Sequence, residues 1–348
     1  MAVNKRIEWV DFVRAVAILT VLYIHATDGI FIISSDSTLR LTLYSRIFEY
    51  ASLFIGRLGV PFFLMITGYL LLDRNYDDER TYNFWVHGCK DLIVVTVIWT
   101  IIYAISLQIV TVGSPSINFV EAGNLFFSHM WYMPMIIGMY ISLPFVAAGL
   151  RPFKEKTIMY GIIAFSLLAF ALPFMSTLLD MQGIKNVTVQ YCLGFSGGIY
   201  GIYILLGYLN KKDCFKKISS KVLWAIAIFS GVFTVAFQYY AYLRGYNFFL
   251  WYEFPFILFG SFALFELCSR IESVPCYNVF AFLSKYSFAV FLIHNLFRLP
   301  LLPYAVEYEL SQPVESLILW VALIILSYAA AVIIYRIPKV GKYILYMK

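Results

Sequence analysis

The chain has 348 residues, of which 61% are hydrophobic, 19% aromatic and 13% charged, and its mean hydropathy is +0.79. Soluble domains carry about 25% charged residues, so this composition excludes an ordinary soluble protein and indicates an integral membrane protein. The formal net charge of +6 could suggest nucleic-acid binding. Because the basic residues gather in loops between apolar runs, the charge is instead typical of membrane topology, and no nucleic-acid partner is expected.

Uncharged runs of about 20 residues, the length a helix needs to cross a bilayer, recur along the chain. They predict an all-α integral membrane protein, a bundle of about ten transmembrane helices, with spans near residues 12–33, 57–73, 92–112, 130–150, 157–179, 188–209, 222–243, 254–269, 286–306 and 317–335. Positive charge precedes the first run, as in a signal peptide, but the run is about twice as long as a signal peptide's apolar region and lacks a small-residue cleavage site. We therefore predict a retained first span and a single transmembrane domain over residues 1–348.

Lys and Arg are distributed unevenly between the two sides of this predicted bundle. Most lie in loops on the side of the N-terminus, and the few in loops on the opposite side are Arg40, Arg46, Lys185 and Arg244. Because cytoplasmic loops are enriched in Lys and Arg, both termini are predicted to be cytoplasmic. The cysteines then fall on the reducing side or within spans, so no disulfide framework is expected.

The first predicted span carries three ionisable side chains, Asp11, Arg14 and His25. An ionisable group at the centre of a span costs roughly 2.5 to 3.5 kcal/mol, so such groups usually line a substrate or proton pathway. At about 100° per residue, Arg14 and His25 share one helix face, about 16 Å apart along the axis, and Asp11 joins that face. This pattern predicts a polar stripe with a fixed cation at one depth and an acid/base group at another. The alternatives are an interhelical hydrogen bond for His25 and a local Asp11–Arg14 salt bridge.

The second predicted span opens with Arg57 and continues through Gly59, Pro61, Thr67 and Gly68. The glycines allow close helix approach, the proline is tolerated in a first turn, and the threonine can hydrogen-bond across helices. Packing does not explain Arg57, which either extends toward the outer membrane surface or lines a channel. Glu253 has the opposite charge and is also predicted near the outer face, so it is a possible partner of Arg57.

Two further histidines lie at predicted spans: His129, followed closely by Trp131 and Tyr132, and His294. Each is either an interhelical hydrogen-bond partner or a channel residue, and the aromatic pair is also typical of a membrane-interface belt. No two of these histidines and His25 have the i, i+3 or i, i+4 spacing of helical metal ligands, so no metal site is expected.

Five motifs, in order along the chain, resemble those of the acyltransferase-3 family of bacterial membrane O-acyltransferases: Arg6 with Asp11, Arg14 and His25; Pro61 to Tyr69; His129 to Tyr132; Leu206 to Tyr208; and Ser287 to His294. The resemblance implies about ten spans in a bacterial cell (inner) membrane and transfer of an acyl group, commonly acetyl from acetyl-CoA, to a cell-envelope glycan or related acceptor. Acyl-CoA is then a substrate, with no bound cofactor. By the resemblance His25 is the catalytic base and Arg14 a donor-site residue, whereas His129, Trp131 and Tyr132 match a motif of less defined role.

The chemistry of the first span suits this implied reaction. Acyl transfer to a hydroxyl needs a base that is neutral near pH 7, and histidine provides one. Arg14 offers a permanent charge for a donor phosphate or for the thioester region, and Asp11 can orient it. The resulting hypothesis is that a donor enters from the cytoplasm while His25 activates an acceptor hydroxyl approaching from outside.

Some features depart from the family pattern or favour another class. Thr67-Gly68 replaces the family's Ser-Gly pair, and without an appended extracytoplasmic domain the membrane core or a separate partner must handle the acceptor. The membrane-bound serine racemases of vancomycin resistance are similar across the same spans, so the chain is either a full-length acyltransferase or a membrane half with a role in serine uptake. A transporter with an unwound segment at Gly194–Gly198 is the competing class. The acceptor, the acyl chain length and the oligomeric state stay open.

Overall fold

The computed structural model describes residues 6–36, 42–112, 120, 123–124, 130–184, 198–307, 310–338 and 341–347. All regular structure in these residues is helical, which confirms the all-α prediction. Within the described residues eight helices are long and apolar enough to cross a membrane. They are α1 (Glu8–Asp36), α2 with α3 (Leu43–Arg57, Gly59–Leu71), α4 with η1 and α5 (Asp78–Phe84, Trp85–Cys89, Lys90–Val112), α7 (Tyr132–Leu150), α8 with η2 and α9 (Glu155–Ser166, Leu167–Ala171, Leu172–Met181), α11 (Ser220–Leu243), α13 (Tyr277–Glu307) and α14 (Gln312–Tyr335).

The two other predicted spans correspond to shorter helices. The first is α10 (Gly198–Lys211, 14 residues), and residues 185–197, which the prediction included, lie outside the described residues. The second is α12 (Pro255–Ser269, 15 residues), which begins where Pro255 occupies its first turn. A short helix α15 (Gly341–Ile344) follows α14.

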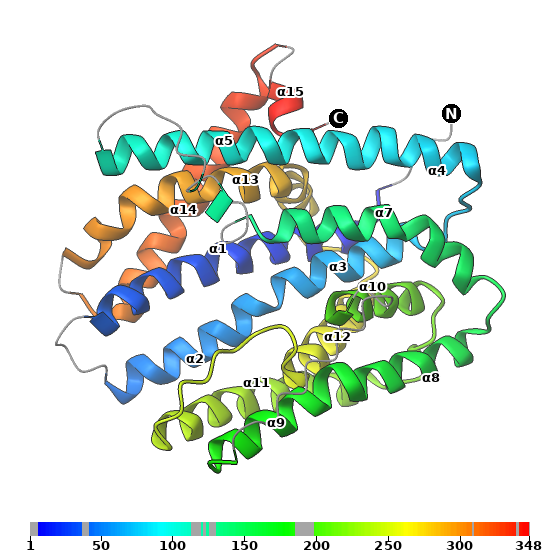
Figure 1. Ribbon diagram of the computed structural model, residues 1–348, viewed down its shortest axis with the longest axis horizontal. Helices are drawn as coiled ribbons and strands as arrows, with labels where there is room; N and C mark the ends of the chain where they lie inside the picture. The colour runs from blue at the N-terminus through cyan, green and yellow to red at the C-terminus, as the bar shows by residue number, and fades with distance from the viewer. Residues whose placement is uncertain are drawn as a thin grey trace.

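Helix α1 lies in the middle of the bundle, where it contacts α2, α3, α12, α13 and α14. Figure 1 shows α5 along one edge of the bundle and α8 and α9 along the opposite edge, with α1 between them. Helix α1 is closely packed on more than one side, since Ala15, Ala17, Ile18 and Leu22 have no exposed surface. The ionisable side chains of Glu8, Asp11, Arg14, His25 and Asp28 on α1 are accordingly buried or partly buried among the neighbouring helices.

The second span differs from the prediction because it starts earlier and is broken. Helix α2 begins at Leu43, after Thr42 Oγ1 accepts a hydrogen bond from the Ser45 amide over 3.1 Å. It ends at Arg57 because Pro61 lacks the N–H group that would donate to the Arg57 carbonyl. The polar residues of α2 lowered its local hydropathy, so the apolar run began only at residue 57. Arg57 consequently lies at a helix break inside the span.

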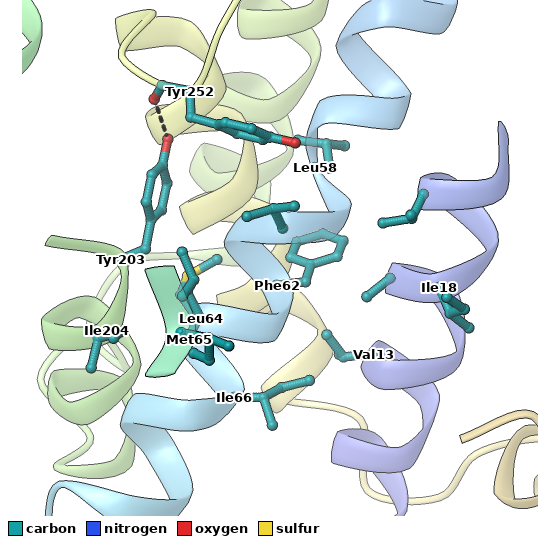
Figure 2. Packing of buried hydrophobic residues seen from close by; sticks show 14 of the residues in the cluster. Val13, Ile18, Leu58, Phe62, Leu64, Met65, Ile66, Tyr203, Ile204 and Tyr252 are labelled. Atoms are coloured by element: carbon teal, nitrogen blue, oxygen red, sulfur yellow. Dashed lines mark hydrogen bonds between the residues drawn. The ribbon is translucent and has the colours of Figure 1, made fainter. Parts of the chain in front are cut away.

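Helices α3 and α10 are in direct backbone contact through two glycines. A Cβ atom added at Gly68 of α3 would meet the carbonyl oxygen of Ile204, and one added at Gly207 of α10 would meet that of Met65. Figure 2 shows Met65 of α3 and Ile204 of α10 within the same buried cluster. The predicted close approach at Gly68 is thus confirmed, and its partner is α10.

Candidate functional site

Asp11 is a buried carboxylate, 3% exposed, that joins α1 to α13. Its Oδ1 accepts hydrogen bonds from Ser284 Oγ at 2.6 Å and from Arg14 Nη1 at 3.3 Å. Its Oδ2 accepts one from the Tyr277 hydroxyl at 2.8 Å and lies 3.1 Å from Arg6 Nε. Because four donors on two segments converge on one carboxylate, Asp11 fixes the position of α1 at this end of the bundle.

Arg14 is oriented by the same network. Its Nη1 donates to Asp11 and also to Ser284 Oγ at 3.2 Å, so both of these bonds use one nitrogen of the guanidinium. The side chain is 28% exposed, and Tyr140 of α7 lies within electrostatic reach of it. The predicted salt bridge to Asp11 therefore exists, but it is part of a larger interhelical network that holds the guanidinium in place while leaving part of it accessible.

Replacing Asp11 by alanine should lower the stability of the protein. The substitution removes the acceptor of four donors, and leaving buried hydrogen-bonding groups without partners costs about 1 to 3 kcal/mol each, less for the exposed Arg6. Thermal unfolding of purified protein in detergent measures this effect. Ser284→Ala is the matched control, because it removes a single donor to the same carboxylate and should shift the unfolding midpoint by less. An unfolding midpoint of Asp11→Ala equal to that of the wild type would contradict the central role of this carboxylate.

Further along α1 a cavity opens beside His25. The volume of this cavity is about 70 Å³. Three ionisable side chains from two helical segments line it, His25 and Asp28 of α1 and Arg57 at the end of α2. The remaining lining is apolar and mainly aromatic, with Val21, Ile24, Val60, Phe63, Trp131, Tyr132, Tyr252, Phe288 and Phe291. An apolar cavity with a few converging polar groups is the usual form of a small-molecule site.

The His25 segment of α1 is held by α13. The ring centroids of His25 and His294 are 5.0 Å apart, and the rings are tilted by 35°. His294 has no exposed surface, and its Nδ1 is 2.7 Å from the Phe291 carbonyl. Arg298 Nε donates to the His25 carbonyl over 2.8 Å. His294 therefore packs on the ring of His25 and contributes to its surroundings, although it does not line the cavity itself.

Arg57 lies almost completely buried, with 7% of its surface exposed, among aromatic rings of the loop between α11 and α12. Its Cζ is 4.4 Å from the ring centroid of Trp251 and 5.4 Å from that of Tyr252. Tyr203 of α10 donates to the Tyr252 carbonyl over 2.8 Å, as the dashed line in Figure 2 shows. The Trp251 Nε1 donates to the Tyr200 hydroxyl over 3.3 Å. These bonds fix the aromatic faces that contact the guanidinium.

Glu253, the suggested partner of Arg57, forms no ion pair with it within 4.0 Å in the described part of the chain, although the two charges interact electrostatically. Glu253 is exposed and lines a separate groove with Asn247 and Phe249. Its two predecessors, Trp251 and Tyr252, contact the guanidinium instead. The loop directs these rings inward, where their apolar area is buried, and leaves the carboxylate in contact with solvent.

The aromatic pair at the start of α7 joins the cavity wall. The Trp131 ring is 5.2 Å from that of Trp251, and the Tyr132 ring is 5.5 Å from that of Phe291. These two residues therefore belong to the site and do not form a lipid-facing belt. His129 lies outside the described residues.

Two charged residues near the cavity were not among the candidates drawn from the sequence, Asp28 and Arg298. Asp28 lies one turn after His25 on α1, and its carboxylate interacts electrostatically with both Arg57 and Arg298. The i, i+3 spacing from His25 is a signal that could have identified it. Among the described residues no group of three or more His, Cys, Asp or Glu could hold a metal ion.

Comparison with protein-family models matches residues 7–336 to a family described as acyltransferase domain, acyltransferase type 3. No curated protein and no solved structure matches the chain.

Proposed function

Because this match covers nearly the whole chain, the protein belongs to the acyltransferase-3 family, and we propose that it transfers an acyl group, acetyl in the first instance, from cytoplasmic acyl-CoA to a hydroxyl of a cell-envelope glycan or small acceptor. The observation that carries this proposal is the cavity beside His25, which places a base between aromatic walls. This base lies on the same helix as Arg14. We place the protein, a multi-pass membrane protein, in the bacterial cell (inner) membrane.

His25 supplies the base in the proposed reaction. Its neutral imidazole takes the proton of the acceptor hydroxyl as the oxygen attacks the thioester carbonyl carbon. The carbon–sulfur bond then breaks, and the imidazolium returns the proton to the CoA thiolate. The aromatic walls suit this role because they limit competing attack by water.

Arg14 supplies a donor contact in the proposed reaction. Acyl-CoA carries its thioester at the end of a long flexible arm, so its phosphates can lie near Arg14 while the thioester reaches His25, about 16 Å away along α1. The contact to Asp11 and Ser284 fixes the guanidinium before the donor binds, which reduces the entropy lost on binding.

Replacing Arg14 by alanine should weaken acetyl-CoA binding about ten- to a hundredfold, because a charge-assisted hydrogen bond contributes about 1.5 to 3 kcal/mol. Equilibrium binding of acetyl-CoA to purified protein in detergent measures this. Arg6→Ala is the matched control: it removes the other arginine at Asp11, which is 53% exposed, and should change the Kd less. Equal affinities for wild type and Arg14→Ala would remove Arg14 from the donor site.

A further inference from the structure

Arg57 is a buried cation whose presence neither packing nor the donor and base roles explain. Among the described residues no carboxylate lies within 4.0 Å of its guanidinium, and its Nε has no hydrogen-bond partner. Burying a charge in a membrane span without an ion pair is costly, and such groups typically mark functional sites. A negative charge that forms beside Arg57 during the reaction offsets this free-energy cost.

The fold holds Arg57 close to the turn of α1 that carries His25. A Cβ atom at Gly59 would lie 2.7 Å from the Ala17 carbonyl oxygen and 2.8 Å from Val21 Cγ2, so the break between α2 and α3 packs directly on α1. Gly56, on the other side of Arg57, packs on Ile24 in the same way. The break thus places a fixed guanidinium and the His25 imidazole on the wall of one cavity.

The environment of the guanidinium favours a role in charge stabilisation. The rings of Trp251 and Tyr252 cover it, which excludes water and lowers the local dielectric constant, and electrostatic interactions are stronger in such surroundings. The Asp28 carboxylate lies within electrostatic reach of both Arg57 and Arg298, so it partly balances two cations. Glu253 also interacts electrostatically with Arg57, but it is exposed, and neither carboxylate forms an ion pair with the guanidinium in the described part of the chain. The guanidinium can therefore donate to an anion in the cavity.

We propose that Arg57 is a catalytic residue that stabilises the oxyanion formed on the thioester carbonyl oxygen during acyl transfer. This role of Arg57 rests on the proposed function. As the acceptor oxygen adds to the carbonyl carbon, the carbon–oxygen π electrons move to the carbonyl oxygen, and the guanidinium donates a charge-assisted hydrogen bond to it. When the intermediate collapses, the carbonyl re-forms and the CoA thiolate leaves, taking the proton held by His25. A donor aimed at developing charge accelerates the chemical step and contributes less to ground-state binding.

The test compares Arg57→Gln and Arg57→Lys with the wild type, using acetyl-CoA hydrolysis without an acceptor and equilibrium acetyl-CoA binding. Removing one oxyanion donor typically costs about 10² to 10³ in kcat, so Arg57→Gln should lose that much turnover while its Kd for acetyl-CoA changes less than about threefold. Arg57→Lys retains the charge and should recover part of the lost kcat. If Arg57→Gln does not fold, Arg57→Met, which keeps an apolar stem, takes its place.

Arg46→Gln is the matched control. Arg46 also lies on α2, its Cζ is 3.8 Å from the Tyr242 ring, and its Nε likewise has no partner among the described residues, but it does not line the cavity. The proposal would be overturned if Arg57→Gln hydrolysed acetyl-CoA at the wild-type rate, or if Arg57→Gln and Arg46→Gln lost kcat equally. If the wild-type protein neither binds nor hydrolyses acetyl-CoA, the proposed function is contradicted before any Arg57 variant is compared. The role of Arg57 as an oxyanion donor is then contradicted as well.

Discussion

Replacing His25 by alanine should lower acetyl-CoA turnover by about 10² to 10⁴-fold, the usual contribution of a general base. The imidazole lines the cavity in which donor and acceptor are proposed to meet, and among the ionisable groups of that cavity it is the one suited to proton transfer near neutral pH. Donor affinity should change little, since Arg14 lies about 16 Å away along the helix. Release of free CoA thiol and equilibrium acetyl-CoA binding, measured on the same preparation, separate the two effects.

Two variants serve as controls for His25→Ala. His87→Ala changes an exposed histidine on the π-helical turn η1, outside the cavity, and should leave turnover unchanged. His294→Ala removes the ring that packs on His25 and should reduce turnover less than His25→Ala does, because the base itself remains. Turnover of His25→Ala within a few-fold of the wild type would exclude His25 as the base.

Replacing Gly207 by alanine should destabilise the whole bundle. The added Cβ would collide with the Met65 carbonyl, a backbone atom that moves only if α3 and α10 separate. Overpacking of this kind typically costs about 1 to 3 kcal/mol, and Gly207→Leu should yield little folded protein. The consequence extends to the site, since α10 holds Tyr252 through Tyr203 and α3 adjoins Arg57.

Thermal unfolding in detergent and the yield of monodisperse protein measure the effect at Gly207. Gly161→Ala is the matched control, because that glycine lies inside α8 with no neighbouring atom within 4 Å of an added Cβ. It should be neutral or slightly stabilising, since alanine favours a helix over glycine by about 1 kcal/mol. Equal unfolding midpoints for Gly207→Ala and Gly161→Ala would contradict the described contact.

Periodicity predicted much of α1 and little of what surrounds it. The apolar length identified the helix, and the angular spacing grouped Asp11, Arg14 and His25. The partners of Asp11 on α13 could not be predicted, because Ser284 is 273 residues away along the chain and a helical pattern defines a face without naming the helix that covers it. For the same reason Gly68 indicated that another helix packs closely on α3, but the sequence did not identify that helix. The structure shows that it is α10, with Gly207 at the contact.

Arg57 shows a second limit of sequence patterns. Its charge identified it as a candidate, but the polar residues of α2 moved the predicted start of the span, so Arg57 was expected at a helix beginning and lies at a break. Its partners come from a loop, where no helical period sets the direction of side chains. Charge complementarity therefore suggested Glu253, whereas burial of apolar area selected Trp251 and Tyr252.

The measurement that tests the acyltransferase proposal most directly is the release of CoA from acetyl-CoA by the purified wild-type protein in detergent. We expect saturable acetyl-CoA binding and slow release of CoA thiol that exceeds the rate of His25→Ala in the same detergent. A wild-type protein that neither binds acetyl-CoA nor releases CoA, but carries serine into proteoliposomes, would contradict the proposal and identify a transporter.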